Sequence, residues 1–331
     1  IIAEAGVNHN GKINNALRLV DIAKNAGADA VKFQTFLPGE LTGNFAKNPN
    51  YIKKNNSFKV TRSELTKKLA LTFEEFDRIK KYCDKKKIIF ISTPDGTKSL
   101  NFLVKTLKVS FIKISSTELT NLEFLKEIAK KKKTTLLSTG LGDIKDVERA
   151  VRQITKYNKK LVIMQCTSEY PAPLNEMNIN VLKTYKKKFK CQIGLSDHSE
   201  GYEAAVTSVA LGATIIEKHF TINKKMRGPD HKASLSKKEL TSFIKSIRNA
   251  EKVMGSEKKK ITKSEQKNIF SIRRGLVAKK FISKGTMLES KLINFKRPFK
   301  EFHPYEINKV IGKKTKTNLK KDQPITKKNI K

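Results

Sequence analysis

The chain has 331 residues, of which 70 are Lys or Arg and 31 are Asp or Glu, so its formal net charge is +39. This length can bury a substantial core in one large domain or two smaller ones, which excludes a small disulfide-stapled scaffold. Hydrophobic residues make up 38% of the chain. No apolar run approaches the roughly 18 residues of a membrane helix, so we expect no membrane span.

The excess of basic residues first suggests nucleic-acid binding. Ten of the 70 basic residues are Arg, and the Lys residues are scattered over every predicted helix and loop. No helix-turn-helix, zinc-finger or RNA-binding pattern is present, so we expect a solvated, lysine-rich surface and no nucleic-acid partner. The three cysteines, Cys83, Cys166 and Cys191, have no metal-like or redox-like spacing, which predicts reduced thiols in a cytoplasmic protein.

Short β-branched runs alternate with amphipathic helical patterns from the start of the chain, which is typical of βα units and a parallel sheet. Eight strands are predicted, at residues 1–4, 30–34, 88–92, 111–114, 134–138, 161–166, 191–195 and 215–219. Helical patterns lie between them, and a last helix is predicted at about residues 237–253. This order predicts an α/β fold, a (β/α)₈ TIM barrel over residues 1–254.

A polar, Lys-rich stretch at residues 255–267 predicts a linker. From residue 268 the βα alternation stops, and short strands with Gly, Pro and Lys turns are predicted instead. Here IxKGxxLxxxxI, residues 282–293, is echoed 37 residues later by LxKDxxIxxxxI, residues 319–330. This two-fold repeat predicts a small β-rich domain over residues 268–331.

Polar residues end or follow every predicted strand of the barrel. The active site of a (β/α)₈ barrel lies at these carboxyl ends, so such residues are candidates by position. They are Glu4, Lys32, Gln34, Ser92, Thr93, Lys113, Ser115, Ser116, Glu118, Ser138, Thr139, Thr167, Ser168, Tyr170, Ser196, Asp197, His198, Lys218 and His219. One such residue alone is more often a solvated loop residue, but their occurrence at all eight strands predicts a shared site.

Two lysines, Lys32 and Lys113, interrupt otherwise apolar strands. Burying an ammonium group without an anionic partner is costly. With Gln34 and the neighbouring hydroxyl groups, they predict a site for a small ligand that carries several negative charges, such as a phosphate and a carboxylate.

Two of the five histidines, His198 and His219, end adjacent predicted strands. Either one alone is more often a hydrogen-bonded loop residue. Together, with Glu4 and Asp197 nearby, they predict a divalent cation with open coordination positions.

Two further loops, NHNG at residues 8–11 and RGPDHKASL at residues 227–235, are predicted on the same face of the barrel. Each can be explained by turn chemistry alone, because Asn-Gly and Gly-Pro-Asp are turn formers. Alternatively, Asp230 and His231 bind the hydroxyl groups of a polyol.

The chain contains, in this order, IIAEAGVNHNG, DAVKFQTF, FISTPDG, KISSTE, LLSTG, QCTSEYPAP, IGLSDHS, EKHFT and GPDHKASL. These motifs and their spacing resemble the sialic acid synthase family, which comprises N-acetylneuraminate, legionaminate and pseudaminate synthases. The tail, with KGTMLESKLINFKRP, resembles the antifreeze-like (SAF) β-clip domain of that family. The resemblance covers nearly the whole chain.

The resemblance implies a transferase that condenses phosphoenolpyruvate with an open-chain N-acetylmannosamine-type sugar. Its products would be phosphate and a nine-carbon 2-keto acid, N-acetylneuraminate or legionaminate. A divalent metal ion is implied, Mn²⁺ ahead of Mg²⁺ or Co²⁺, with His198 and His219 as its ligands. Glu4 and Glu118 are implied to transfer protons and to orient water.

The resemblance also implies the substrate contacts. They are Lys32, Gln34, Thr93, Lys113, Ser116, Ser138 and Ser196 for phosphoenolpyruvate, with Ser168, Tyr170 and Asp230 for the sugar. Arg297, in the KRP motif, is implied to reach the sugar pocket of the other subunit in a domain-swapped homodimer. Three positions depart from the family's common pattern: Thr117 replaces a Gly, Asp95 replaces an aromatic residue, and Ser168 replaces an Asn found in some relatives.

Three alternatives remain open at this point. The first two are a pseudaminate synthase and another phosphoenolpyruvate-condensing barrel synthase that makes a seven- or eight-carbon keto acid. The C-terminal domain argues against the second. The third is a carbohydrate- or ice-binding protein without catalysis, which leaves the polar residues of the barrel mouth unexplained.

Overall fold

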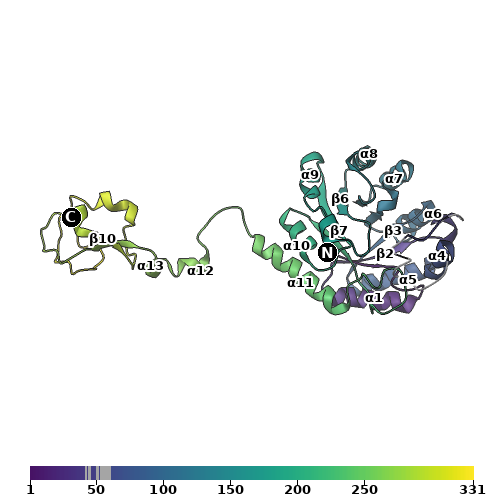
Figure 1. Cartoon of the computed structure of the whole chain (residues 1–331), viewed down its shortest axis with the longest axis horizontal. Coiled ribbons are helices and arrows are strands. Elements are labelled where there is room, and N and C mark those ends of the chain that lie inside the picture. Colours follow the sequence, from purple (N-terminus) through teal and green to yellow (C-terminus); the bar gives the residue numbers. More distant parts are fainter. Residues whose placement is uncertain (42, 44–45, 50–51, 53–60) are drawn as a thin grey trace. The chain divides into compact units, whose positions relative to one another are not determined.

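The computed structural model, which describes residues 1–41, 43, 46–49, 52 and 61–331, contains a closed parallel barrel (Figure 1). Its strands are β1 (Ile2–Gly6), β2 (Ala30–Thr35), β3 (Ile89–Pro94), β4 (Phe111–Ile114), β5 (Thr134–Ser138), β6 (Leu161–Cys166), β7 (Gln192–Asp197) and β8 (Ile215–His219). Each strand pairs with the next in the chain, and β8 pairs in parallel with β1, which closes the barrel. The predicted (β/α)₈ barrel is confirmed.

Helices surround the strands (Figure 1). They are α1 (Ile13–Ala26), α2 (Pro38–Leu41), α4 (Arg62–Leu69), α5 (Phe73–Lys86), α6 (Thr97–Asn101), α7 (Leu122–Lys130), α8 (Ile144–Thr155), α9 (Val181–Lys188), α10 (Glu203–Ala210) and α11 (Lys237–Met254). Capping boxes start several of them: Thr72 pairs with Glu75 at α5, and Ser236 pairs with Glu239 at α11. Each box satisfies backbone N–H groups that the first turn of a helix leaves free.

Two apolar layers stabilise the barrel. Outside the strands, α1, α5 and α11 bury one face each, with Leu19, Ile79 and Ile247 almost fully buried. Inside the barrel, a smaller cluster fills the lower part: Ile2, Ala30, Ile91, Leu136, Val162 and Met164. Because the barrel is packed below, a ligand can enter only above this layer, at the carboxyl ends of the strands.

The seventh strand is longer than predicted. The prediction ended it at residue 195, whereas β7 continues to Asp197. The extension occurs because Ser196 and Asp197 still pair with Glu217 and Lys218 of β8. The strand therefore carries two polar residues into the barrel wall.

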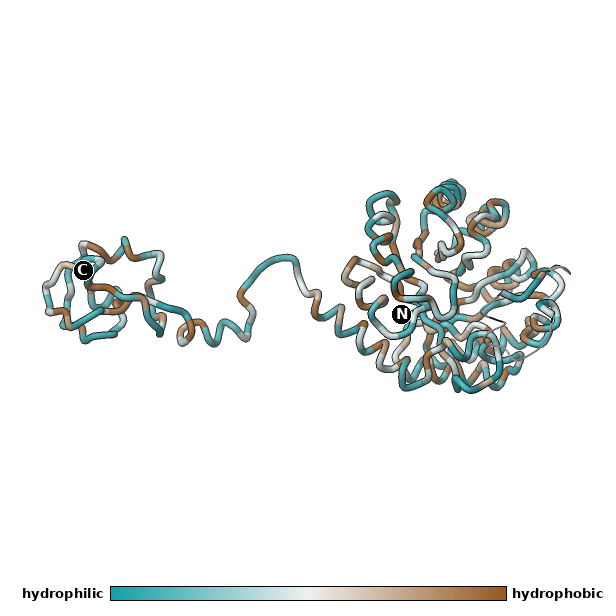
Figure 2. Tube along the Cα trace, viewed as in Figure 1, coloured by the Kyte–Doolittle hydropathy of each residue, from teal (hydrophilic) through white to brown (hydrophobic). Residues whose placement is uncertain are grey.

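Residues Ser256–Lys331 form a second compact unit, separate from Ile1–Gly255. Residues 256–267 are exposed, and Figure 2 shows the segment just after α11 mostly in the hydrophilic colour. The unit contains the short helices α12 (Lys263–Gln266) and α13 (Ile269–Ile272) and an antiparallel pair, β9 (Gly275–Ala278) and β10 (Ile293–Lys296).

The internal repeat of the second unit encodes its core. The repeated apolar positions are all buried in one cluster: Ile282, Leu288 and Ile293 in the first copy and Leu319, Ile325 and Ile330 in the second. The two copies contact each other through an antiparallel bridge between Ile282 and Leu319. Gly285 and Asp322 hold equivalent places, and both have positive φ, at 86° and 65°. Gly and Asp are among the residues that tolerate this turn conformation.

Among the helices of the described residues, none combines the length and the apolar character needed to cross a membrane.

Candidate active site

Side-chain alternation along the strands places a polar layer above the apolar filling of the barrel. Successive residues of a strand point to opposite faces, so the residues two positions beyond the apolar layer also face inward. These inward residues are Glu4, Lys32, Gln34, Thr93, Lys113, Ser138, Ser196, Glu217 and His219. Seven of the predicted phosphoenolpyruvate and proton-transfer positions therefore lie in one layer, together with one of the predicted metal ligands.

Lys32 is buried at the centre of this layer. Its Nζ donates to Glu4 Oε1 over 2.8 Å and to Thr93 Oγ1 over 3.3 Å. Gln34 Nε2 donates to the same Glu4 oxygen over 3.3 Å. Burial lowers the pKa of Lys32, but the charges of Glu217 and Glu4 outweigh it and raise that pKa, so the ammonium stays charged.

Glu217, which was not among the predicted site residues, joins the two buried lysines. Its Oε1 lies 3.2 Å from Lys113 Nζ and 3.8 Å from Lys32 Nζ, and it accepts from Ser196 Oγ over 3.0 Å. Burial raises the pKa of Glu217, but Lys113 and Lys32 outweigh burial and lower it to about 2. The motif EKHFT could have predicted this position. Glu217 is two residues before His219, so both side chains lie on the same face of the strand.

The pKa of Glu4 shifts in the opposite direction to that of Glu217. Burial raises its pKa most, Lys32 lowers it, and the neighbouring charge of Glu217 raises it again, so the net direction is upward. Its second oxygen, Oε2, is buried without a hydrogen-bond partner, as is Oε2 of Glu217. Of the two buried carboxyl groups, Glu4 is therefore the one suited to gain and lose a proton.

Lys218 and Asp197 do not belong to this layer, contrary to the prediction that both lie at the mouth. Lys218 Nζ donates to Asp197 Oδ2 over 2.8 Å and lies 5.6 Å from the ring centre of Phe243 in α11. Asp197 Oδ1 accepts from the hydroxyl of Ser199 over 2.7 Å. The pair occupies the outward positions of β7 and β8, so it joins the barrel wall to α11.

The two predicted metal ligands lie side by side, His219 in the polar layer and His198 next to it. The ring centres of His198 and His219 are 5.4 Å apart. His198 Nδ1 lies 2.7 Å from the carbonyl oxygen of Thr167, so Nδ1 donates to that oxygen, and in the neutral ring the lone pair is on Nε2. His219 Nδ1 is buried without a hydrogen-bond partner.

Such a pair of imidazoles suits a cation site in which the protein supplies two nitrogen ligands. In the described part of the chain, no group of three or more His, Cys, Asp or Glu side chains is arranged to hold a metal ion. The pair therefore fits an open catalytic site better than a closed structural site.

Hydroxyl groups converge next to these histidines around Gly140. The amide of Gly140 donates to Ser116 Oγ over 3.0 Å. A Cβ atom at residue 140 would lie 2.3 Å from Ser168 Oγ and 2.9 Å from Ser116 Oγ, so a larger residue there would displace both hydroxyl groups. The buried Ser138 Oγ has no hydrogen-bond partner. A ligand oxygen placed here would satisfy that hydroxyl.

Tyr170 and Asp230 border a cavity of about 90 Å³ beside the histidines, together with Gln34 and His219. The Tyr170 ring is centred 4.0 Å from the ring of His198 and 5.5 Å from that of His219. Burial, and then the charge of Glu4, raises the pKa of Asp230 to about 6. Two of the three barrel residues predicted to contact the sugar thus lie next to the predicted metal ligands.

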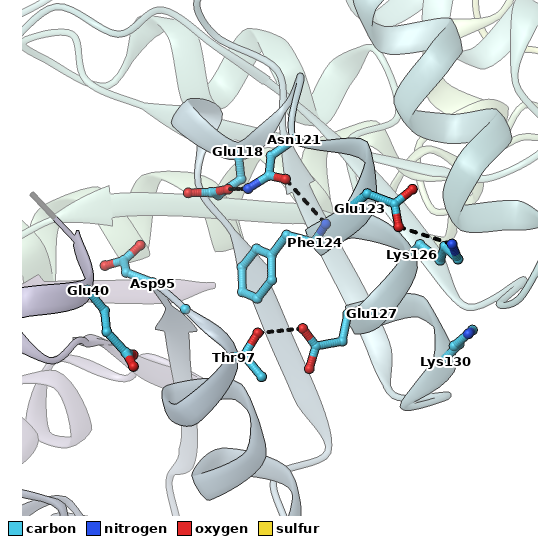
Figure 3. Close-up of a pocket in the computed structure, with 11 residues that line it drawn as sticks. Glu40, Asp95, Thr97, Glu118, Asn121, Glu123, Phe124, Lys126, Glu127 and Lys130 are labelled. Carbon is cyan, nitrogen blue, oxygen red and sulfur yellow. Dashed lines mark hydrogen bonds and ion pairs between the residues drawn. The ribbon is translucent and has the colours of Figure 1, made fainter. Parts of the chain in front are cut away.

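Glu118 faces a larger pocket of about 570 Å³, which Figure 3 shows between the loops after β3 and β4 and helix α7. Glu118 Oε2 accepts from Asn121 Nδ2 over 2.7 Å. Asp95 borders the same pocket, and burial, with the charge of Glu118, raises its pKa to about 7. Glu118 thus lies apart from the Lys32 network, in contrast to Glu4.

Arg297 is exposed and follows β10 in the second unit. Its place in a sugar pocket stays a prediction.

Comparisons with known proteins agree with the motifs. The model of the NeuB family matches residues 19–259, and the model of the SAF domain matches residues 273–331. The N,N'-diacetyllegionaminic acid synthase of Campylobacter jejuni is 41% identical over 328 residues, which cover 98% of each chain. The human N-acetylneuraminate-9-phosphate synthase is 31% identical over 98% of this chain and 90% of its own length.

A solved structure supports the same assignment. The N-acetylneuraminic acid synthetase of Leptospira borgpetersenii, in complex with citrate, has 34% sequence identity and a TM-score of 0.72 over 81% of this chain and 89% of its own. With a family model that matches most of the barrel, a whole-length relative at 41% identity and this structural match, the chain belongs to the NeuB family and ends in a SAF domain.

Proposed function

We propose that the protein condenses phosphoenolpyruvate with an N-acetylated mannosamine-type sugar to give a nine-carbon 2-keto acid and phosphate. The observation that carries this proposal is the pair of buried lysines, Lys32 and Lys113, which form ion pairs with Glu4 and Glu217 inside the barrel. Phosphoenolpyruvate carries up to three negative charges, which two ammonium groups can partly neutralise. The relatives named above support a legionaminate-type or N-acetylneuraminate-type product.

The proposed binding of phosphoenolpyruvate uses groups of the polar layer together with Ser116, which follows β4. Lys32 and Lys113 supply charge, and the hydroxyl and amide groups supply hydrogen bonds in a site from which water is largely excluded. These polar groups are Gln34, Thr93, Ser116, Ser138 and Ser196. Tyr170 and Asp230 border the adjoining cavity, and Ser168 lies beside Gly140. All three are proposed to contact the sugar.

A divalent ion, Mn²⁺ ahead of Mg²⁺ or Co²⁺, is proposed to bind His198 and His219. The lone pair of His198 Nε2 and the unpartnered His219 Nδ1 support this assignment. When bound, such an ion acts as a Lewis acid toward the sugar aldehyde.

The carbon–carbon bond forms between C3 of phosphoenolpyruvate and the aldehyde carbon of the sugar, whose oxygen takes up a proton. The electron-poor C2 then accepts a water molecule. Glu4, whose pKa is raised by burial, is proposed to take the proton of that water, and Glu118 is the second candidate. The tetrahedral centre at C2 expels phosphate by cleavage of its C–O bond, which leaves the keto group.

A domain-swapped homodimer is proposed for the full chain. The second unit is compact by itself and follows an exposed segment of 12 residues, 256–267. Such a segment gives the second unit freedom to meet a partner barrel. Arg297 of one chain is proposed to complete the sugar pocket of the other. A cytoplasmic location is also proposed, supported by three free thiols.

A pseudaminate synthase remains a second candidate, because the pseudaminic acid synthase of Campylobacter jejuni is 35% identical over 97% of this chain. The pseudaminate synthase and the legionaminate- or N-acetylneuraminate-type synthase differ only in the sugar that they condense with phosphoenolpyruvate. A carbohydrate-binding protein without catalysis would have no use for two buried lysines, so this alternative is the weaker one.

Incubation of the protein with Mn²⁺, phosphoenolpyruvate labelled with ¹⁸O at its bridging oxygen, and a panel of N-acetylated hexoses tests the proposed function. We expect one sugar to give a nine-carbon keto acid by mass, with one phosphate released per product. The label should leave in phosphate, since C2 rather than phosphorus is attacked. A label retained in the keto acid would contradict the C–O cleavage, and the absence of any condensation product would contradict the function.

His198→Ala should remain folded and lose turnover. Mn²⁺ binding, measured by calorimetry, should weaken by more than about 100-fold, because even the loss of an outer-shell partner costs ~10–100-fold. His303→Ala, in the second unit, serves as the control and should bind Mn²⁺ as the parent does. Parent-like metal affinity in His198→Ala would remove His198 from the metal site.

Arg297→Lys should lose activity almost as Arg297→Ala does, because a guanidinium binds sugar oxygens through several donors in a fixed geometry. Mixed dimers of Arg297→Ala and His198→Ala chains should regain activity, because one of the two shared sites then has both residues intact. Separately tagged chains allow the heterodimer to be purified. A heterodimer without recovered activity would show that the site is not shared.

A further inference from the structure

Two loops meet where the barrel closes. The loop after β1 contains Asn8, His9 and Asn10, and the loop after β8 contains Asp230, the proposed sugar contact. The loops are neighbours because β1 pairs with β8. Most of the polar side chains that join them are almost fully buried.

The first connection passes through Asn8. Its Nδ2 donates to the carbonyl oxygen of Phe220 over 2.8 Å and to Ser234 Oγ over 2.9 Å. Ser234 Oγ in turn donates to the carbonyl oxygen of Asp230 over 2.6 Å. The backbone of Asp230 is therefore held from the opposite loop through two side chains.

The second connection passes through Asn10 and His231. Asn10 Nδ2 donates to the carbonyl oxygen of Arg227 over 2.9 Å, so Asn10 Oδ1 is left as an acceptor. His231 Nε2 lies 3.0 Å from that oxygen, and His231 Nδ1 lies 2.6 Å from Thr221 Oγ1. Burial lowers the pKa of His231 to about 4, so the ring is neutral. Its Nε2–H donates to Asn10, and its Nδ1 accepts from Thr221.

Gly228 permits this close approach. A Cβ atom at Gly228 would lie 2.6 Å from His231 Cδ2 and 2.9 Å from Asn10 Oδ1. A side chain at residue 228 would therefore displace Asn10 or His231, whose hydrogen bond joins the two loops.

We infer that Asn10 and His231 are positioning residues for the sugar pocket and act through Asp230. The inference rests on the proposed function, in which Asp230 contacts the sugar. Neither Asn10 nor His231 borders the cavity that Asp230 borders, whereas Pro229 and Asp230 both do. Asp230 lies between two anchors, the Ser234 bond at its own carbonyl and the Asn10 bond at the next residue, which together fix where its carboxyl group points.

The test compares the kinetics of both substrates in single variants. His231→Ala and Asn10→Ala should raise the KM for the sugar by ~10-fold or more, because a displacement of about 1 Å at a binding group can cost ~10²-fold. The KM for phosphoenolpyruvate should change by less than about 2-fold, because Lys32 and Lys113 lie on other strands.

Conservative variants separate positioning from folding. His231→Gln keeps an N–H group that can donate to Asn10 Oδ1, so it should restore a KM for the sugar close to that of the parent. Asn10→Asp keeps the acceptor for His231 but loses the donor to Arg227, so its effect should be intermediate. The matched control is Asn158→Ala, which removes a buried Asn whose Nδ2 donates to the carbonyl oxygen of Lys133 at the opposite end of the barrel. It should lower the melting temperature and leave both KM values unchanged.

Any one of three results would overturn the inference. In the first, His231→Ala and Asn10→Ala raise the KM values of both substrates together. In the second, the Asn158→Ala control shifts the sugar KM as much as His231→Ala does, and in the third, the sugar KM of His231→Gln is as high as that of His231→Ala. A parent protein that forms no keto acid from any sugar is a different outcome: it rejects the proposed function, and this inference with it, before any variant is compared.

Discussion

A protein interior accepts an ammonium group only where a carboxylate neutralises it, and this constraint organises the barrel. Lys32 and Lys113 are buried together, and Glu4 and Glu217 neutralise them within 2.8 to 3.8 Å. Without a ligand, two positive groups face two acidic groups. Burial and the charge of Glu217 raise the pKa of Glu4, whereas the two lysines lower that of Glu217. Glu4 therefore binds a proton more readily than Glu217 does, and it is the carboxyl group proposed for proton transfer.

Two features of the barrel determine where the other residues of the site lie: the alternation of side chains along each strand, and the pairing of β8 with β1 that closes the barrel. An apolar layer closes the barrel below the charges, and the histidines and Tyr170 lie above them. Lys218 and Asp197 form an ion pair on the outer face of the barrel, where Lys218 contacts Phe243 of α11, and neither side chain lies in the site. At the seam between β1 and β8, hydrogen bonds between two loops set the place of Asp230. The charged groups, the proposed metal ligands and the proposed sugar contacts therefore come from different strands of the barrel and the loops that follow them.

Much of this arrangement could be predicted from the sequence, because barrel strands are short, regular and polar at their ends. The eight strands, the barrel and the clustering of Lys32, Lys113, His198 and His219 follow from that pattern. Glu217 was missed, and Asp197 and Lys218 were expected at the mouth although they face outward, because position near a strand end does not tell which face a residue occupies. The alternation of side chains along a strand supplies this information. Because His219 faces the inside of the barrel, Glu217, two residues earlier, also faces inward, and Lys218 faces outward. The bonds between loops, such as Asn10 to His231, join residues 221 positions apart and leave no periodic signal in the sequence.

The central claim is that the two buried lysines form the binding site for an anionic substrate. Calorimetric titration of phosphoenolpyruvate, in the presence of Mn²⁺ and without sugar, into the parent and into Lys113→Met tests it most directly. Removal of one partner of a buried charge pair costs about 2–5 kcal/mol, so the Kd should rise by at least ~30-fold while the barrel still unfolds cooperatively on heating. A Lys113→Met protein that is folded and binds phosphoenolpyruvate as tightly as the parent would contradict the account.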